Sequence, residues 1–281
     1  MTWAMATPIR TPLTVYCLHH AGGRESMFRD WSCWAPRWLR FRGVPLHKAV
    51  ECQTIASERS FRGALETCLD FIRSDVHGEY ALFGYSMGGL LAIEAASELT
   101  TVWGQPPMTI TVAAAAPPER QPDWRKLMSQ TDDELFEFLS TQAGLEGHDI
   151  PVPELREYAI AAFRQDLVLL ATREYRPPRR VSCPIGVLLG NRDPLVPLSA
   201  AELWRDYTSG PVTIQVVPGD HGFPRRYGRE TLGRVVQHIE AAASLREIVP
   251  KLATNPTSGS TDTVPIVADD KPRAMRAVKA W

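Results

Sequence analysis

The chain has 281 residues, of which 44% are hydrophobic and 22% are charged, a composition that is ordinary for a globular protein. Its 31 basic and 32 acidic residues give a formal net charge of −1, which provides no overall attraction for nucleic acid or an anionic membrane. No apolar run approaches the roughly 18 residues of a membrane-spanning helix, and the N-terminal residues do not resemble a secretory signal. We therefore expect a cytoplasmic protein that binds neither nucleic acid nor membrane.

The cysteines do not form a recognisable ligand or disulfide pattern. They are Cys17, Cys33, Cys52, Cys68 and Cys183. Their number is odd, their spacing is wide and no C-x-x-C pair occurs, which argues against both a disulfide framework and a zinc site. We expect reduced thiols, with Cys17 and Cys68 as small buried hydrophobic residues.

Strand-like and helix-like patterns alternate over the first 116 residues. The predicted strands are 13–18, 43–50, 80–84 and 108–116, each a short apolar or β-rich run. The predicted helices are a tryptophan-rich segment over 28–38, followed by 60–73, with Ser60 as its cap, and 90–99. Such alternation is typical of a mostly parallel sheet with helices on both faces.

A stretch without convincing strands interrupts this alternation. In residues 122–176, Thr131 and Glu134 have the spacing of a capping box, and 153–174 is one long helical pattern. Alternation then resumes with strands over 183–190 and 212–217 and helices over 199–207 and 228–246. We predict one α/β domain over 1–250 with a helical insertion at about 119–180. Residues 251–281 are rich in Thr, Ser, Pro and Asp, and we expect a disordered tail.

The segment Gly84-Tyr85-Ser86-Met87-Gly88 matches the pattern G-x-S-x-G. The pattern alone is weak, but here a predicted strand precedes it and a predicted helix follows, as a nucleophile elbow requires. Such a turn presents the serine hydroxyl above the sheet, next to the free N–H groups of the helix N-terminus. The alternative is a glycine-rich turn with an incidental serine.

A serine nucleophile needs a base and an acid, and both follow at predicted strand ends. Asp193 comes directly after strand 183–190, and His221 comes after strand 212–217, in the order Ser, Asp, His. Asp220 is a competing acid, but we prefer Asp193 because a residue adjacent to His221 is badly placed to orient its ring. The alternative for Asp193 is a simple turn-forming role.

The segment His19-His20-Ala21-Gly22-Gly23 follows the first predicted strand, where a second oxyanion donor is expected. We predict that the backbone N–H groups of Ala21 and Met87 form the oxyanion hole. Adjacent histidines in a strand point to opposite faces and do not chelate together easily, so we predict no metal site. We interpret the remaining histidines as surface residues: His47, His77, His148 and His238.

Taken together, LHHAGG, GYSMGG, GNRDPLVP and GDHGF around a helical insertion resemble the type II thioesterases of the α/β-hydrolase superfamily. These enzymes accompany nonribosomal peptide and polyketide synthases. The resemblance covers about residues 13–242, and TDDELFEFLSTQAG with the later Phe163-Arg164-Gln165-Asp166-Leu167 fits the lid region of that family. It implies an α/β-hydrolase fold with a helical lid, a catalytic triad of Ser86, Asp193 and His221, and oxyanion donors at Ala21 and Met87.

The resemblance also implies a substrate and a partner. The substrate is an acyl thioester on the phosphopantetheine arm of an acyl or peptidyl carrier protein, so the chain needs no cofactor of its own, and we expect a monomer. Candidates for docking an acidic carrier are Arg24 and Arg29, with solvated surface charge as the alternative for each. Candidates for substrate contact, with simple packing as the alternative, are Tyr85, Phe136, Leu139 and Phe163. Tyr85 also stands where the family often has histidine.

Two alternative functions stay open at this point. The same triad would serve an acyltransferase, a cyclase or an esterase, because a second nucleophile other than water leaves no motif. A protein with a decayed site that only binds acyl groups or carriers is a further alternative. The complete set of Ser86, Asp193 and His221 argues against that one.

Overall fold

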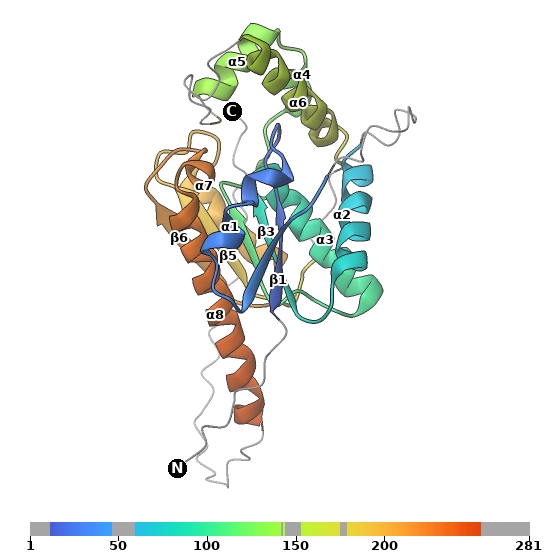
Figure 1. The fold of residues 1–281 in the computed structure, drawn as a ribbon, viewed down its shortest axis with the longest axis vertical. Coiled ribbons are helices and arrows are strands. Elements are labelled where there is room, and N and C mark those ends of the chain that lie inside the picture. Colours follow the sequence, from blue (N-terminus) through green and yellow to red (C-terminus); the bar gives the residue numbers. More distant parts are fainter. Residues whose placement is uncertain (1–11, 47–59, 142, 144–152, 175–178, 254–281) are drawn as a thin grey trace, which may run out of the picture.

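The computed structural model describes residues 12–46, 60–141, 143, 153–174 and 179–253 (Figure 1). Within these residues, six strands form one parallel sheet in the order β2-β1-β3-β4-β5-β6. The strands are β1 (Leu13–Leu18), β2 (Leu39–Gly43), β3 (Tyr80–Tyr85), β4 (Ile110–Ala113), β5 (Ile185–Gly190) and β6 (Val212–Val217). The winding reverses between β1 and β3, and parallel α/β sheets bind their ligands beyond the carboxyl ends of the strands at such a reversal.

Helices cover both faces of this sheet, as predicted (Figure 1). One face carries α2 (Phe61–Asp75), α3 (Met87–Trp103) and the 3₁₀ helix η5 (Leu198–Tyr207). The other carries η1 (Glu25–Phe28), α1 (Trp31–Trp34), α7 (Phe223–Arg226) and α8 (Gly228–Ala253). Strand β1 contributes side chains to the apolar layers on both faces. Tyr16 and Leu18 lie in the layer with α2 and α3, and Val15 and Cys17 lie in the layer with α1 and α8.

Local signals in the sequence explain where the central helices begin and end. The Ser60 Oγ accepts a hydrogen bond from the Gly63 N–H at 3.1 Å and caps α2, as predicted. Helix α3 is buried over most of its length between the sheet and α2, and it ends at Gly104, whose left-handed φ of 66° closes the last turn.

A helical insertion lies between β4 and β5, beyond the end of the sheet (Figure 1). Its elements are η3 (Pro118–Arg120), α4 (Trp124–Met128), α5 (Asp132–Thr141) and α6 (Pro153–Ala171). The insertion has an apolar cluster of its own, made of Leu127, Leu135, Leu139, Ile160, Phe163 and Leu167. The predicted capping box is present before α5, where the Thr131 N–H donates to Glu134 at 2.7 Å and the Glu134 N–H donates to Thr131 Oγ1 at 3.3 Å.

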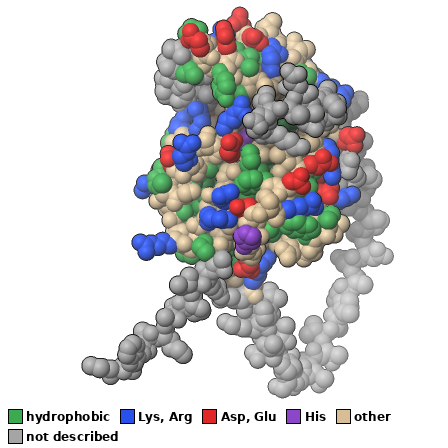
Figure 2. All heavy atoms as spheres, turned by 45° about the vertical axis from the view of Figure 1, so that its right-hand side comes forward, with side chains coloured by type: hydrophobic (Ala, Val, Ile, Leu, Met, Phe, Trp, Pro, Cys, Tyr) green, Lys and Arg blue, Asp and Glu red, His purple; other side chains and the backbone are tan. Residues whose placement is uncertain are grey.

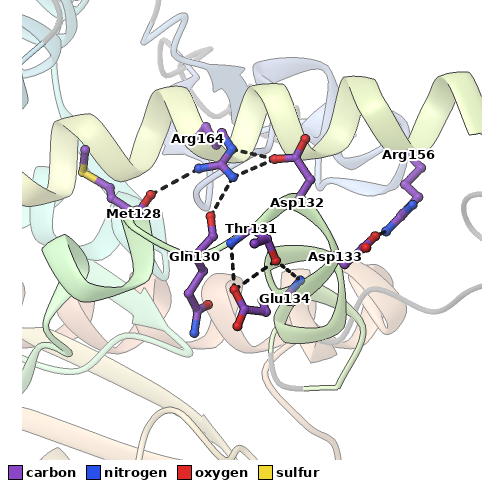
Figure 3. A network of polar contacts seen from close by, with 8 residues as sticks. All are labelled: Met128, Gln130, Thr131, Asp132, Asp133, Glu134, Arg156 and Arg164. Atoms are coloured by element: carbon purple, nitrogen blue, oxygen red, sulfur yellow. Dashed lines mark hydrogen bonds and ion pairs between the residues drawn. The ribbon is translucent and has the colours of Figure 1, made fainter.

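Charged groups hold the insertion together from the outside (Figure 3). Arg164 of α6 donates to the carbonyls of Met128 at 3.2 Å and Gln130 at 2.8 Å, and it binds the carboxylate of Asp132. Arg156, nearer the N-terminus of α6, pairs with Asp133 in the first turn of α5. The turn between α4 and α5 is therefore attached to α6 by side chains far apart in sequence.

Two predicted elements are wrong in position or length. The second strand lies at Leu39–Gly43, with Leu39 and Phe41 buried and the intervening Arg40 exposed. Residues 44–46 of the prediction are not strand, and 47–50 lie outside the described residues. The predicted helix over 28–38 is only η1 and the one-turn α1, because the residue before Pro36 is extended and ends the helix. The helix predicted over 199–207 is present as a 3₁₀ helix over Leu198–Tyr207.

Helix α8 is longer than predicted and continues to Ala253, so it includes the first three residues of the predicted tail. Residues 254–281, to which the rest of that prediction applies, lie outside the described part of the chain. Within the described residues no helix is both long enough and apolar enough to cross a membrane.

The prediction that His238 lies at the surface is wrong. It is only 6% exposed, because it belongs to the face of α8 that packs on the sheet beside Val235 and Ile239. Its ring occupies the space over Gly186 in β5, where a side chain would otherwise begin. Burial, together with the nearby charge of Arg234, lowers the pKa of His238 to about 4. His77 is exposed as predicted, while the two remaining predictions fall outside the described residues: His47 and His148.

The thiols are buried as the sequence predicts for Cys17 and Cys68, and Cys183 joins them. Burial raises the pKa of the Cys68 and Cys183 thiols to about 12, so these side chains behave as small hydrophobic groups. Cys33 is exposed, and Cys52 lies outside the described residues.

Candidate active site

Ser86 lies in a strained turn between β3 and α3. Its φ of 53° and ψ of −115° fall outside the ordinary regions for a residue with a side chain, which is typical of a nucleophile elbow. The turn packs backbone against backbone. A Cβ on Gly84 would lie 2.3 Å from the Gly88 carbonyl oxygen, and one on Gly88 would lie 2.2 Å from that of Leu18. Glycine is therefore required at both positions.

Two later loops bring a histidine and a carboxylate to this serine. The Ser86 Oγ lies 2.9 Å from His221 Nε2, and His221 Nδ1 lies 2.9 Å from Asp193 Oδ2. The Asp193 side chain is fully buried, and its Oδ1 also accepts the N–H groups of Leu195 at 2.9 Å and Val196 at 3.1 Å. Because an ionised carboxylate only accepts, His221 carries its proton on Nδ1, which leaves Nε2 to accept from the serine hydroxyl.

The competing acid, Asp220, is occupied elsewhere. It accepts the Gly222 N–H at 2.9 Å and a hydrogen bond from Arg226 at 2.8 Å. Burial raises its pKa, but the hydrogen bonds from Arg226 and Gly222 outweigh that effect and hold the pKa of Asp220 below its usual value. Of the two acids, the structure brings Asp193 to the His221 ring.

The loops after β5 and β6 are linked to each other and to β3. Asn191 accepts the Gly219 N–H at 3.0 Å through its side chain, and the Arg192 N–H donates to the Gly219 carbonyl at 2.9 Å. The buried Tyr85 hydroxyl donates to the carbonyl of His221 at 3.0 Å. These contacts fix the backbone that carries Asp193 and His221 relative to the elbow.

The histidine pair after β1 holds the loop that contains Ala21. The His19 Nδ1 lies 2.8 Å from the His20 carbonyl, and the His20 Nδ1 lies 2.8 Å from the Ala21 carbonyl. Since a carbonyl only accepts, both rings carry a proton on Nδ1. Burial lowers the pKa of His20 to about 3, so this ring is neutral near pH 7. Each ring therefore donates to a carbonyl of the loop that contains Ala21.

The Thioesterase domain family matches residues 13–243 of this chain. The chain belongs to that family. It is 29% identical over 238 residues to the thioesterase PikA5 of Streptomyces venezuelae, and the match covers 79% of each protein. Among solved structures, the RedJ thioesterase of the prodiginine pathway of Streptomyces coelicolor superposes with a TM-score of 0.73 at 26% identity, over 83% of this chain and 92% of RedJ.

The type II thioesterase BorB, from the borrelidin biosynthetic cluster, superposes with a TM-score of 0.70 at 28% identity, over 82% of this chain and 94% of BorB. Together with the family match, these relatives confirm the resemblance to the type II thioesterases of polyketide and nonribosomal peptide biosynthesis. The chain is a thioesterase with the α/β-hydrolase fold, as the sequence predicts.

The substrate-contact candidates of this thioesterase lie in three different environments. Tyr85 is 1% exposed, and its hydroxyl holds the His221 backbone by donating to the carbonyl. Leu139 and Phe163 belong to the apolar cluster of the insertion, while Phe136 is partly buried beneath the guanidinium of Arg156. Phe163 also lies against Gly22, next to the predicted oxyanion loop. Of the four candidates, Phe163 is therefore the one on α6 that joins the insertion to the loop after β1.

Two residues of the thioesterase site escaped prediction. Asp166 of α6 is buried, and its Oδ2 accepts the Gly22 N–H at 2.7 Å. Asn191 links the loops after β5 and β6. A signal for Asp166 exists in the sequence, because it recurs at helical spacing with the buried Phe163, Leu167 and Leu170. No group of three or more metal-ligating side chains occurs within the described residues.

Proposed function

We propose that this thioesterase hydrolyses acyl thioesters on the phosphopantetheine arm of an acyl or peptidyl carrier protein, with Ser86 as the nucleophile. The observation that supports this mechanism best is the unbroken hydrogen-bonded series from Ser86 through His221 to Asp193, with both distances at 2.9 Å. A serine hydroxyl becomes nucleophilic only when such a base accepts its proton.

In the acylation step, His221 Nε2 takes the hydroxyl proton as Ser86 Oγ attacks the thioester carbonyl carbon. Asp193 keeps the ring oriented and stabilises the imidazolium that forms. The N–H groups of Ala21 and Met87 receive the negative charge on the former carbonyl oxygen. Collapse of this intermediate breaks the carbon–sulfur bond, and the thiol leaves with the proton from His221. Its pKa is near 8.5 if it behaves like cysteine, so it is a good leaving group.

Deacylation uses the same groups with water in place of the serine. His221 accepts a proton from the water, whose oxygen attacks the ester carbonyl of the acylated Ser86. The intermediate collapses to a free carboxylic acid, and the serine recovers its proton from the imidazolium. The net reaction consumes one water and yields one acid and one thiol.

The carrier-docking surface in this proposal includes the loop after β1. Arg29 is exposed there, and Arg24 lies over the Tyr158 ring of α6 and donates to its hydroxyl at 3.3 Å. The outer end of the insertion is acidic by contrast, with the first turn of α5 carrying exposed carboxylates (Figure 2). An acidic carrier would therefore be drawn to the arginines of the body and away from the end of α5. In the same proposal the insertion acts as a lid over the acyl group, and the chain works as a monomer.

Mass spectrometry of acyl-loaded carrier proteins tests this function. We expect the chain to remove the acyl mass and release the free acid, and Ser86→Ala to leave the carriers loaded. The rate with carriers should fall with ionic strength more than the rate with small soluble thioesters. An ester, amide or cyclic product would instead indicate acyl transfer, and activity retained by Ser86→Ala would exclude Ser86 as the nucleophile.

A further inference from the structure

We propose that Asp166 is a positioning residue that connects the helical insertion to the oxyanion hole. In this inference α6 holds the loop after β1 in the conformation that directs the Ala21 N–H toward the acyl group. The insertion would then control the chemistry as well as cover the substrate. The inference rests on the proposed function, because it assigns Ala21 the role of oxyanion donor.

The first peptide unit of the loop, between His20 and Ala21, is held at its carbonyl end. The His20 carbonyl oxygen accepts two hydrogen bonds, from the His19 ring at 2.8 Å and from the Gly23 N–H at 2.9 Å. In a trans peptide the N–H points away from the carbonyl, so this pair of contacts also fixes the direction of the Ala21 N–H.

The second peptide unit, between Ala21 and Gly22, is held at both ends. The His20 ring donates to the Ala21 carbonyl at 2.8 Å, and the Gly22 N–H donates to Asp166 Oδ2 at 2.7 Å. Of the four polar groups in the two peptide units, only the Ala21 N–H has no hydrogen bond to another described residue. The loop thus leaves one donor available, which is the one that the reaction requires.

Three of the four contacts come from the loop itself, and the fourth comes from the insertion. Asp166 is 1% exposed and 144 residues from Gly22 in sequence, so its hydrogen bond exists only while α6 lies against the loop. Gly22 has a φ of 79°, which glycine adopts about as readily as a negative φ, so the backbone conformation alone does not lock this peptide unit. At 2.7 Å between the Gly22 nitrogen and Asp166 Oδ2, a carboxylate acceptor gives one of the stronger hydrogen bonds available to a backbone amide.

Apolar packing follows the same path. Ala21 contacts both the main apolar cluster beneath the sheet and the separate cluster of the insertion. Phe163, one turn before Asp166 on α6, lies against Gly22 with its Cα and Cβ. If α6 moved away from the body, the loop would lose the Asp166 hydrogen bond and the Phe163 contact together.

Other links attach α6 to the body without reaching this loop, and they offer a control. The Thr172 Oγ1, just after α6, accepts the Phe61 N–H at 3.0 Å. Thr172→Val therefore removes one connection between α6 and the body at a distance from the oxyanion loop. Asp166→Asn retains an acceptor oxygen for Gly22 but removes the charge.

The test compares Asp166→Ala, Asp166→Asn and Thr172→Val by steady-state kinetics on a small soluble acyl thioester. We expect Asp166→Ala to lower kcat by about 10- to 100-fold with KM changed less than about threefold, since removal of one oxyanion donor costs 10²–10³. Asp166→Asn should recover most of that loss, and Thr172→Val should stay within about threefold of the parent. The labelling rate of Ser86 by a phosphonate, which also develops an oxyanion, should fall in parallel with kcat.

Thermal unfolding of each variant shows whether it is folded before its kinetics are read. Equal losses in Asp166→Ala and Thr172→Val would overturn the inference, because they would mean general loosening of α6. So would an Asp166→Ala enzyme with the parent's kcat and labelling rate. Either result leaves the proposed function intact if Ser86→Ala is inactive, whereas an active Ser86→Ala would refute the function itself.

Discussion

The body of the molecule and the helical insertion are built by different kinds of contact. In the body, Ser86, Asp193 and His221 each lie within a few residues of the end of a strand, and the parallel sheet brings those ends together. In the insertion, α4, α5 and α6 depend on Arg164 and on a small apolar cluster whose members are far apart in sequence. In the account proposed above, the body therefore supplies the chemistry from local motifs, while the insertion positions a loop of the site through long-range contacts.

This difference predicts where substitutions act. Changes in the body's site should remove activity and leave the fold intact. Changes in the insertion should alter local stability or positioning, with smaller effects on turnover.

The largest effect should come from removing the nucleophile or its base. Ser86→Ala and His221→Ala should each lower kcat by about 10⁴-fold or more, and the double variant should be little worse than either alone, because the groups act as a unit. Steady-state kinetics on a soluble thioester measures this, with the exposed His77→Ala as the control that keeps parent activity. Additive losses in the double variant would contradict a shared mechanism.

The two acids near His221 offer a sharper comparison within the body. Asp193→Asn should lower kcat by about 10⁴-fold, because an amide N–H facing Nδ1 favours the tautomer that no longer accepts from Ser86. Asp220→Asn should cost less than about tenfold, since Asp220 binds Arg226 and the Gly222 N–H. The reverse order of effects in the same assay would assign the orienting role to Asp220.

The body should also carry an acid-sensitive contribution to stability through His238. Its pKa is about 4 in the folded chain and near 6.5 when unfolded, so the folded state favours the neutral ring. This contribution is complete above about pH 6.5 and is lost as the pH falls toward 4, because the unfolded chain binds the proton more readily.

Urea unfolding at pH 7 and pH 4.5 measures this loss. The decrease in the free energy of unfolding should be about 2 kcal/mol larger for the parent than for His238→Gln. His77→Gln, at an exposed site, should behave like the parent. Equal decreases in the parent and in His238→Gln would show that His238 does not titrate differently on folding.

The smallest effect concerns the insertion. Arg164→Met removes two hydrogen bonds to backbone carbonyls and one partly exposed ion pair, which together are worth about 1–2 kcal/mol. Hydrogen exchange should therefore become faster in α4 and α5 and stay unchanged in α3. Arg62→Met, which breaks surface pairs with Glu66 on α2 and Glu98 on α3, should cost less than about 1 kcal/mol. Unchanged exchange in Arg164→Met would show that the apolar cluster alone holds the insertion.

The sequence predicted the body well because its signals are local. The strand before Ser86, the glycines around it and the order of Asp193 and His221 can all be read within short segments. The errors arose where a local pattern was ambiguous. The tryptophans from Trp31 to Trp38 have helical spacing, yet Pro36 stops the helix and the strand begins at Leu39.

The positioning contacts could not be predicted, since they join segments that no local pattern connects. Asp166 and Gly22 are 144 residues apart, and nothing near either residue indicates the other. The prediction that His238 is a surface residue overlooks Val235 and Ile239, which mark the same helical face as buried. A polar residue at core spacing in a helix is the signal that would have marked Asp166 and His238 as buried, although it would not have named their partners.

The most direct test of the account is a rapid-quench experiment with an acyl-loaded carrier protein in ¹⁸O-labelled water. We predict that the chain gains the acyl mass before the free acid appears, that peptide mapping places the acyl group on Ser86, and that the released acid contains one ¹⁸O. Two results would contradict nucleophilic catalysis by Ser86. One is an acyl group on another residue. The other is release of the acid with no acylated intermediate under conditions that slow deacylation.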